Sequence, residues 1–218
     1  MPGKTPGIEI YLDIIPLEGG DSPSVPNELA ERTFVNAIIG IDEKNGGKTM
    51  NLQRPEWDIY FMMIAGVAAS RSTCLRRNVG AVIVRDNHII STGYNGAPKG
   101  LPHCGEVGCL RTKLGIPSGE RHEICRGSHA EMNAIAQAAS VGTSTAGADI
   151  YCTHEPCSFC TKAIINAGIR RVVYVHPYPD ELARTMRSDA SVTVDKLPES
   201  IFSMVSPLLE GLFKPVSQ

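Results

Sequence analysis

Four residues in the middle of the chain have the types and the spacing of a metal centre. Cys157 and Cys160 form the motif Pro-Cys-x-x-Cys, and His129 and Glu131 form His-x-Glu upstream of it. Thiolates and imidazoles are ligands that zinc prefers, and three protein ligands leave the fourth tetrahedral position open for water. A carboxylate beside such a site can take a proton from the water and pass it on. The pattern therefore predicts a catalytic zinc site with Glu131 as the proton shuttle.

Each of these motifs alone has a simpler interpretation. A single Cys-x-x-Cys pair also suits a redox dithiol, half of a zinc ribbon or two core cysteines. His129 alone suits a helix cap, and Glu131 alone suits an acid that complements a helix dipole. Because the motifs occur together, we favour the open zinc site.

The elements that would position these residues alternate between helix and strand. His129 opens the predicted helix HAEMNAIAQAAS, and the cysteines open CSFCTKAIINAGI, which follows the predicted strand ADIYCTH. In a layered α/β domain both helix starts can face one crevice at the strand ends. The two motifs can therefore meet although they are far apart in sequence.

Apolar periodicity predicts the remaining elements. PEWDIYFMMIAGVAASRS is expected to form a helix, VGAVIVRD and HIISTGYN a hairpin, RRVVYVH and VTVDKL strands, and ESIFSMVSPLLEGLF a closing helix. Residues 94–127 show little periodicity, and HPYPDELA is interpreted as a loop at a strand end near the substrate. The order of the elements predicts an α/β domain with a mixed five-stranded sheet flanked by helices.

Composition and charge disfavour a nucleic-acid-binding protein and a membrane protein. The net charge of −2 gives no general attraction to nucleic acid, and no run approaches the ~20 apolar residues of a membrane-spanning helix. The first residues lack a secretory signal, so we expect a cytoplasmic protein. All seven cysteines lie between residues 74 and 160, which favours metal binding over disulfides.

His-x-Glu followed by Pro-Cys-x-x-Cys resembles the signature of the zinc-dependent nucleobase deaminases. The stretch VGAVIVRDNHIISTGYNGAPKGLPHC, with the Cys- and His-rich insertion that follows, is similar to the deoxycytidylate deaminases. The resemblance runs from about Trp57 to Asp180. It implies a three-layer cytidine-deaminase-like fold in a deaminase domain of residues 55–218, preceded by an extension of residues 1–54.

The resemblance also implies the reaction, the cofactors and the partners. The reaction is hydrolytic deamination of dCMP to dUMP and ammonia, which supplies dUMP for dTTP synthesis. A second, structural zinc is implied, with Cys74, Cys104, His122 and Cys125 as ligands and Cys109 in reserve. Asn95 is implied to contact the sugar. Family members include homo-oligomers, often hexamers, and enzymes regulated by dCTP and dTTP.

Phosphate recognition is assigned less narrowly. Ser128 precedes the helix that begins with His129, where free N–H groups favour anions. The other candidates are Arg71, Arg76, Arg77 and Arg126. Two further functions stay open: deamination of adenosine in tRNA or of another base, and a non-catalytic zinc module that serves as an interaction protein. The second of these has no use for Glu131.

Overall fold

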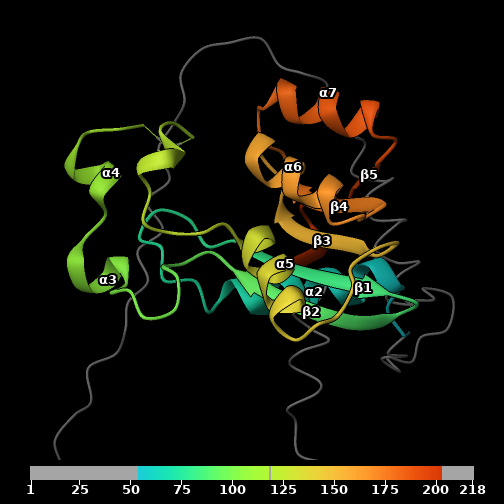
Figure 1. Ribbon diagram of the computed structural model, residues 1–218. Helices are drawn as coiled ribbons and strands as arrows, with labels where there is room; N and C mark the ends of the chain where they lie inside the picture. Colours follow the sequence, from blue (N-terminus) through green and yellow to red (C-terminus); the bar gives the residue numbers. More distant parts are fainter. Residues whose placement is uncertain (1–53, 118, 203–218) are drawn as a thin grey trace, which may run out of the picture. The chain divides into compact units, whose positions relative to one another are not determined.

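The computed structural model describes residues 54–117 and 119–202 (Figure 1). The predicted extension, apart from Arg54, lies outside these residues, as does the closing helix beyond Phe202. The division into residues 1–54 and 55–218 therefore stays a prediction. Within the described ranges, none of the helices has the length and apolar character needed to cross a bilayer.

Five strands form one mixed sheet, as the sequence predicts. Their order is β2-β1-β3-β4-β5, with β1 antiparallel to both β2 and β3, and with β4 parallel to β3 and β5. The strands are β1 (Gly80–Arg85), β2 (His88–Tyr94), β3 (Asp149–His154), β4 (Arg171–His176) and β5 (Thr193–Lys196). Asp86 and Asn87, both with positive φ, close the predicted hairpin as a two-residue turn.

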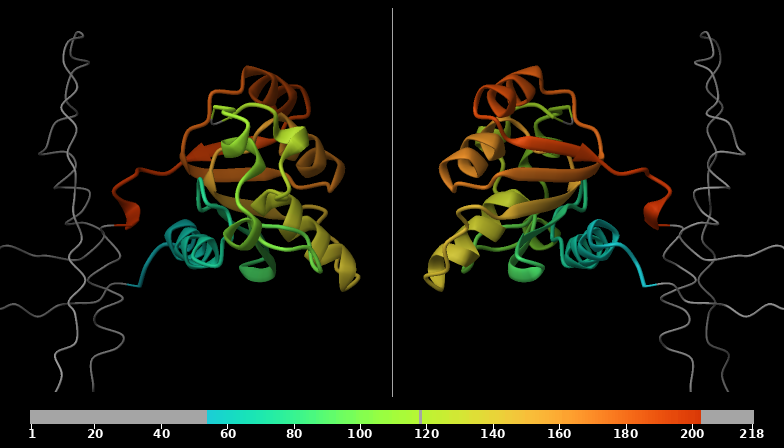
Figure 2. Two further views of the ribbon diagram at one scale, coloured as in Figure 1. Left: turned by 90° about the vertical axis from the view of Figure 1, so that its left-hand side faces the viewer. Right: turned by 90° about the vertical axis from the view of Figure 1, so that its right-hand side faces the viewer.

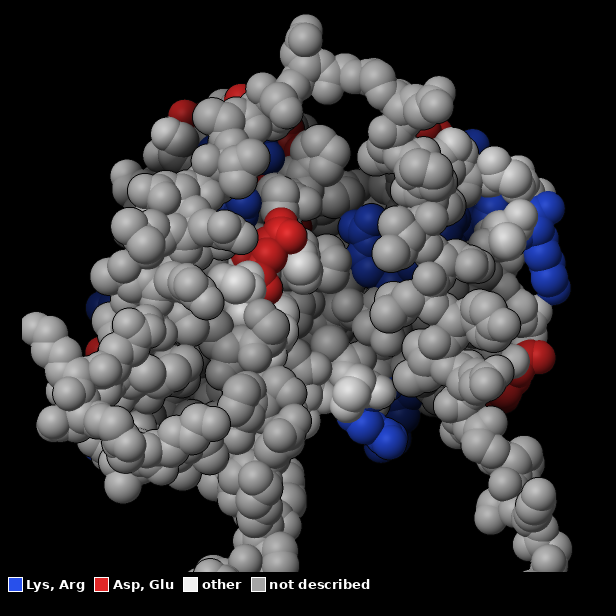
Figure 3. Space-filling view, turned by 180° about the vertical axis from the view of Figure 1, so that it is seen from behind, with Lys and Arg blue, Asp and Glu red and all other residues white. Residues whose placement is uncertain are grey.

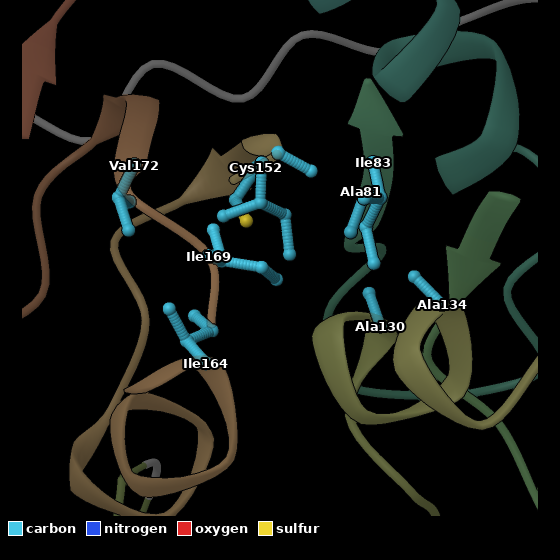
Figure 4. Packing of buried hydrophobic residues seen from close by; sticks show 10 residues of the cluster. Ala81, Ile83, Ala130, Ala134, Cys152, Ile164, Ile169 and Val172 are labelled. Carbon is cyan, nitrogen blue, oxygen red and sulfur yellow. The ribbon is translucent and has the colours of Figure 1, made fainter. Parts of the chain in front are cut away.

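Helices cover both faces of the sheet (Figure 2). The helix α2 (Trp57–Ala69) lies on one face, and α5 (Ala130–Ser140) and α6 (Ser158–Asn166) lie on the other. Side chains of α5 and α6 pack with β1 and β3 in the cluster of Figure 4, where Ala130 and Ala134 face Ala81 and Ile83. Burial of this apolar surface holds the three predicted layers together.

Two glycines allow the helices to lie close to the sheet. A Cβ atom at Gly93 in β2 would lie 2.1 Å from the carbonyl oxygen of Ala130 in α5, and one at Gly80 in β1 would lie 1.9 Å from the carbonyl oxygen of Ala65 in α2. Only glycine fits at such distances. The close approach at Gly93 determines where the first turn of α5, with His129 and Glu131, stands relative to the sheet.

Two segments differ from the prediction. The insertion holds three single turns: α3 (Cys104–Val107), α4 (Leu110–Lys113) and the 3₁₀ turn η1 (His122–Ile124). Elements this short have no detectable apolar period. The interpretation of HPYPDELA as a loop was wrong from Glu181 onward, because α7 (Glu181–Asp189) begins there, after its N-cap Asp180.

Candidate active site

The three predicted zinc ligands meet at the starts of two helices. His129 is the N-cap residue of α5, Cys157 is the N-cap residue of α6, and Cys160 lies in the first turn of α6. His129 Nδ1 lies 3.5 Å from Cys157 Sγ and 3.3 Å from Cys160 Sγ. In a tetrahedral zinc site, bond lengths of about 2.3 Å to sulfur and about 2.0 Å to nitrogen separate those two ligand atoms by about 3.5 Å. The residues therefore fit a zinc ion.

The topology explains how the motifs come together. Strand β3 ends at His154, and the chain then turns into α6 at the edge where the parallel strands β3 and β4 both end. Helix α5 packs across β1 and β2 on the same face as α6. The segment before α5 is held by a short bridge, in which Ser128 N–H donates to the Gly96 carbonyl oxygen (2.8 Å) and Gly96 N–H donates to that of Ser128 (3.1 Å). The GYNG segment thus contacts the residue that precedes His129.

Glu131 lies beside the three ligands. It is buried, and one ligand atom from each of His129, Glu131 and Cys160 falls within 4.8 Å of the others. Burial raises the pKa of the Glu131 carboxyl. A buried carboxyl binds a proton more readily than an exposed one, which suits a group that must both take and return a proton.

The two thiols and the imidazole titrate together. A hydrogen bond from the Cys160 thiol and, after it, one from His129 lower the pKa of Cys157 to about 3. The same bond to Cys157 raises the pKa of Cys160, and Cys157 also raises that of His129. The group therefore carries a thiolate at neutral pH, which is the form that binds a cation.

One cavity connects this group to the insertion. Its walls include His129, Glu131 and Cys157, and three basic side chains, those of Arg76, Arg77 and Arg111. Two carboxylates line it, Glu131 and Glu155, and the second is already paired with Arg184 and Arg187. An anionic group would meet a positively charged wall here.

A family model, the cytidine and deoxycytidylate deaminase zinc-binding region, matches residues 55–176. The chain belongs to this deaminase family. ComE operon protein 2 of Bacillus subtilis is 44% identical over 151 residues, which cover 67% of this chain and 74% of that protein.

Two further relatives carry substrate names. The deoxycytidylate deaminase of Schizosaccharomyces pombe is 44% identical over 130 residues, which cover 59% of this chain but only 39% of that protein. The described fold is also similar to the crystal structure of the dCMP deaminase of cyanophage S-TIM5 in complex with dCMP and dUMP. The TM-score is 0.56 at 30% identity, with 66% of this chain and 99% of that chain covered.

In this deaminase, Asn95 holds the chain before β1. Its Oδ1 accepts from Val79 N–H (2.8 Å), and its Nδ2 donates to the Arg77 carbonyl oxygen (2.7 Å). Asn95 and Ser128 both line the cavity, as do Arg76 and Arg77. Arg71 and Arg126, the other phosphate candidates, are not among its lining residues. Whether Asn95 contacts the sugar stays a prediction.

Of the residues predicted to hold a second zinc, His122 lies apart from the cysteines. One ligand atom from each of His122, His129 and Cys157 lies within 4.8 Å of the others, so His122 stands beside the catalytic group. Its ring is 5.0 Å from that of His129, centroid to centroid. The pKa of Cys104 is raised, chiefly because the thiol is buried. The negative charges of Cys109, Cys74 and Cys125 raise it further. Cys74, which precedes β1, lines the same cavity as the three cysteines of the insertion, Cys104, Cys109 and Cys125.

Sequence reasoning missed Arg111 in the deaminase cavity. This side chain lies on α4, is 8% exposed, and donates from one terminal nitrogen to the Pro117 carbonyl oxygen (3.0 Å). Its Nε has no hydrogen-bond partner among the residues that the structure describes. A helix of one turn with no apolar stripe offers no signal that its arginine is buried.

Asp180 was also missed. One carboxylate oxygen accepts from Ser158 N–H (2.7 Å) at the start of α6, and the other accepts from Ala183 N–H (3.0 Å) at the start of α7. One side chain therefore caps both helices, and its contact with α6 is at Ser158, the residue after Cys157. The signal in the sequence is the aspartate itself, which is a preferred N-cap residue before a helix such as α7.

Proposed function

We propose that the chain is a zinc-dependent dCMP deaminase, which converts dCMP and water into dUMP and ammonia and so supplies dUMP for dTTP synthesis. The observation that carries the proposal is the group of His129, Cys157 and Cys160 with Glu131 buried beside it. The substrate names of the fission yeast and cyanophage relatives support dCMP.

Glu131 is the residue that moves protons in this reaction. Bound zinc would act as a Lewis acid that lowers the pKa of a water molecule towards about 7. The Glu131 carboxylate takes the proton of the attacking water and delivers it to the departing ammonia. Burial raises the pKa of this carboxyl and so favours the protonated form that it adopts between taking the proton and delivering it.

The charge of the cavity favours a nucleotide over a nucleoside or a free base. Arg76, Arg77 and Arg111 line the same cavity as Glu131. On the face seen in Figure 3, both basic and acidic side chains of the described residues are visible, and the net charge of the chain is −2. A single phosphate suits this distribution better than the extended backbone of a tRNA.

A panel of substrates tests the proposal. Ammonia release is measured with dCMP, deoxycytidine, cytidine, guanine and an anticodon stem-loop, on protein of known zinc content. We expect turnover of dCMP, with kcat/KM for deoxycytidine lower by roughly 10–10²-fold, because a hydrogen bond to a charged group contributes about 1.5–3 kcal/mol. Turnover of guanine or of the stem-loop without turnover of dCMP would contradict the assignment.

A second zinc in the insertion is part of the proposal. Cys104 lines the cavity together with Cys74, Cys109 and Cys125, whereas His122 lies beside His129 and Cys157. We therefore infer Cys109, and not His122, as the fourth ligand. A closed site of four protein ligands is the structural kind, and it would order a segment that has little apolar core.

Metal counting tests this ligand set. We expect two zinc ions per chain in the purified protein, one in Cys109→Ala and two in His122→Ala, measured by elemental analysis of dialysed samples. If His122→Ala lost the second ion and Cys109→Ala retained it, the set first expected from the sequence would be right. A cytoplasmic location, regulation by dCTP and dTTP, and a homo-oligomer stay predictions.

A further inference from the structure

A buried arginine contacts both sides of the cysteine turn. Arg187 in α7 is 2% exposed, and one terminal nitrogen donates to the Pro156 carbonyl oxygen (2.9 Å) and to Thr161 Oγ1 (3.1 Å). Pro156 directly precedes Cys157, and Thr161 directly follows Cys160. The guanidinium therefore joins the two ends of the segment that carries the thiols.

Glu155 holds this guanidinium in place. Its Oε1 accepts from the other terminal nitrogen of Arg187 (2.5 Å), and both side chains are buried. Glu155 also accepts from the Tyr178 N–H (3.0 Å) and from Arg184 (3.1 Å). Its carboxylate thus receives donors from the loop after β4 and from α7, while its own backbone continues into the cysteine turn.

Stability alone does not account for this arrangement. Replacing a buried ion pair by apolar side chains of similar volume is often neutral or stabilising, because the pair loses its hydration. The contacts of Arg187 with Pro156 and Thr161 are directional, however, and hydrogen-bonded partners behind metal ligands orient those ligands.

We propose that Arg187, held by Glu155, is a positioning residue for the metal centre. It fixes the turn from Pro156 to Thr161 so that both thiolates stand at ligand distance from His129. This inference rests on the proposed zinc ligands and is independent of the substrate.

Arg184 provides a matched control. It pairs with the same carboxylate, from the same helix, and its other partners are the Tyr178 carbonyl oxygen and Glu181. Within the described residues it makes no hydrogen bond or ion pair with the turn from Pro156 to Thr161. Arg184→Met therefore removes one of the two positive charges that pair with Glu155, and it removes no contact with the turn.

The experiment compares metal binding by Arg187→Met and Arg184→Met. Zinc affinity is measured by competition with a chromophoric chelator, and His129→Ala provides the baseline for zinc held elsewhere. We expect Arg187→Met to bind zinc about 10–100-fold more weakly, and to give a Co²⁺ absorption spectrum with weaker thiolate bands. Arg184→Met is expected to match the unaltered protein in both measurements.

Thermal unfolding separates positioning from a merely structural role. Zinc stabilises the folded state by an amount that rises with the logarithm of its affinity, so the difference in Tm between zinc-loaded and zinc-free protein should shrink in Arg187→Met. A structural role alone would lower both values of Tm equally. If Arg187→Met does not fold, Glu155→Leu combined with Arg187→Met replaces the pair by apolar side chains and is expected to show the same weak zinc binding.

Unchanged zinc affinity and an unchanged cobalt spectrum in a folded Arg187 variant would overturn the inference, as would an equal loss in Arg184→Met. A protein that binds zinc normally but releases no ammonia from dCMP would instead refute the proposed function and leave the role of Arg187 intact.

Discussion

Replacing Glu131 by glutamine leaves zinc bound and abolishes turnover of dCMP. Glutamine has nearly the shape of glutamate, so the buried site beside His129 and Cys160 stays filled. Its amide cannot take a proton from water or deliver one to the departing ammonia. General acid–base catalysis contributes about 10²–10⁴-fold, and we expect kcat to fall by at least that factor.

The measurement pairs steady-state ammonia release with zinc analysis on the same sample. Glu123→Gln changes an exposed carboxylate of the insertion and is expected to keep full activity. Activity retained in Glu131→Gln would exclude the carboxylate as the shuttle. Loss of zinc in that variant would instead make Glu131 a ligand.

Gly93→Ala is expected to destabilise the fold and to disturb the metal centre together. The added Cβ would lie 2.1 Å from the Ala130 carbonyl oxygen and 2.5 Å from Ala134 N. Both are backbone atoms that cannot rotate away, so α5 must move off β2. Overpacking of this kind costs about 1–3 kcal/mol and occasionally more, and we expect about 3 kcal/mol here. Because Ala130 lies between His129 and Glu131, the catalytic geometry moves with it.

Denaturant unfolding and zinc affinity measure the two effects. Gly105→Ala is the control, since its added Cβ would meet no atom within 4 Å and its backbone is not in the left-handed region. We expect Gly105→Ala to unfold at nearly the same denaturant concentration as the unaltered chain. Equal stability of Gly93→Ala would mean that α5 does not lie against β2 as described.

The sequence predicts the strands and the catalytic motifs because both signals are local. Each strand has its own β-branched run, and His129 and Cys157 each occupy the start of a helix that the apolar pattern reveals. The fourth ligand of the proposed second zinc could not be predicted in this way. His122 and Cys109 have comparable spacing to their neighbours, and only the path of the insertion decides that His122 turns towards His129.

Helix α7 shows a second reason for failure. ELARTMRSD has only three apolar residues, and its buried side chains in the described structure are those of Ala183 and Arg187. A buried arginine looks like a surface residue until its partners are known. Here the partners are Glu155, Pro156 and Thr161, which precede it by more than twenty residues. Sequence reasoning about one helix at a time cannot find them.

The shared cap at Asp180 has a consequence for how the metal would leave. Because one carboxylate caps the N-termini of both α6 and α7, fraying of one helix at this end removes a hydrogen bond from the other. The two helices should then open as a single cooperative unit of local unfolding. Exchange of the ion held by Cys157 and Cys160 would follow the rate of that opening, and the lifetime of the bound metal would be a property of the helix pair.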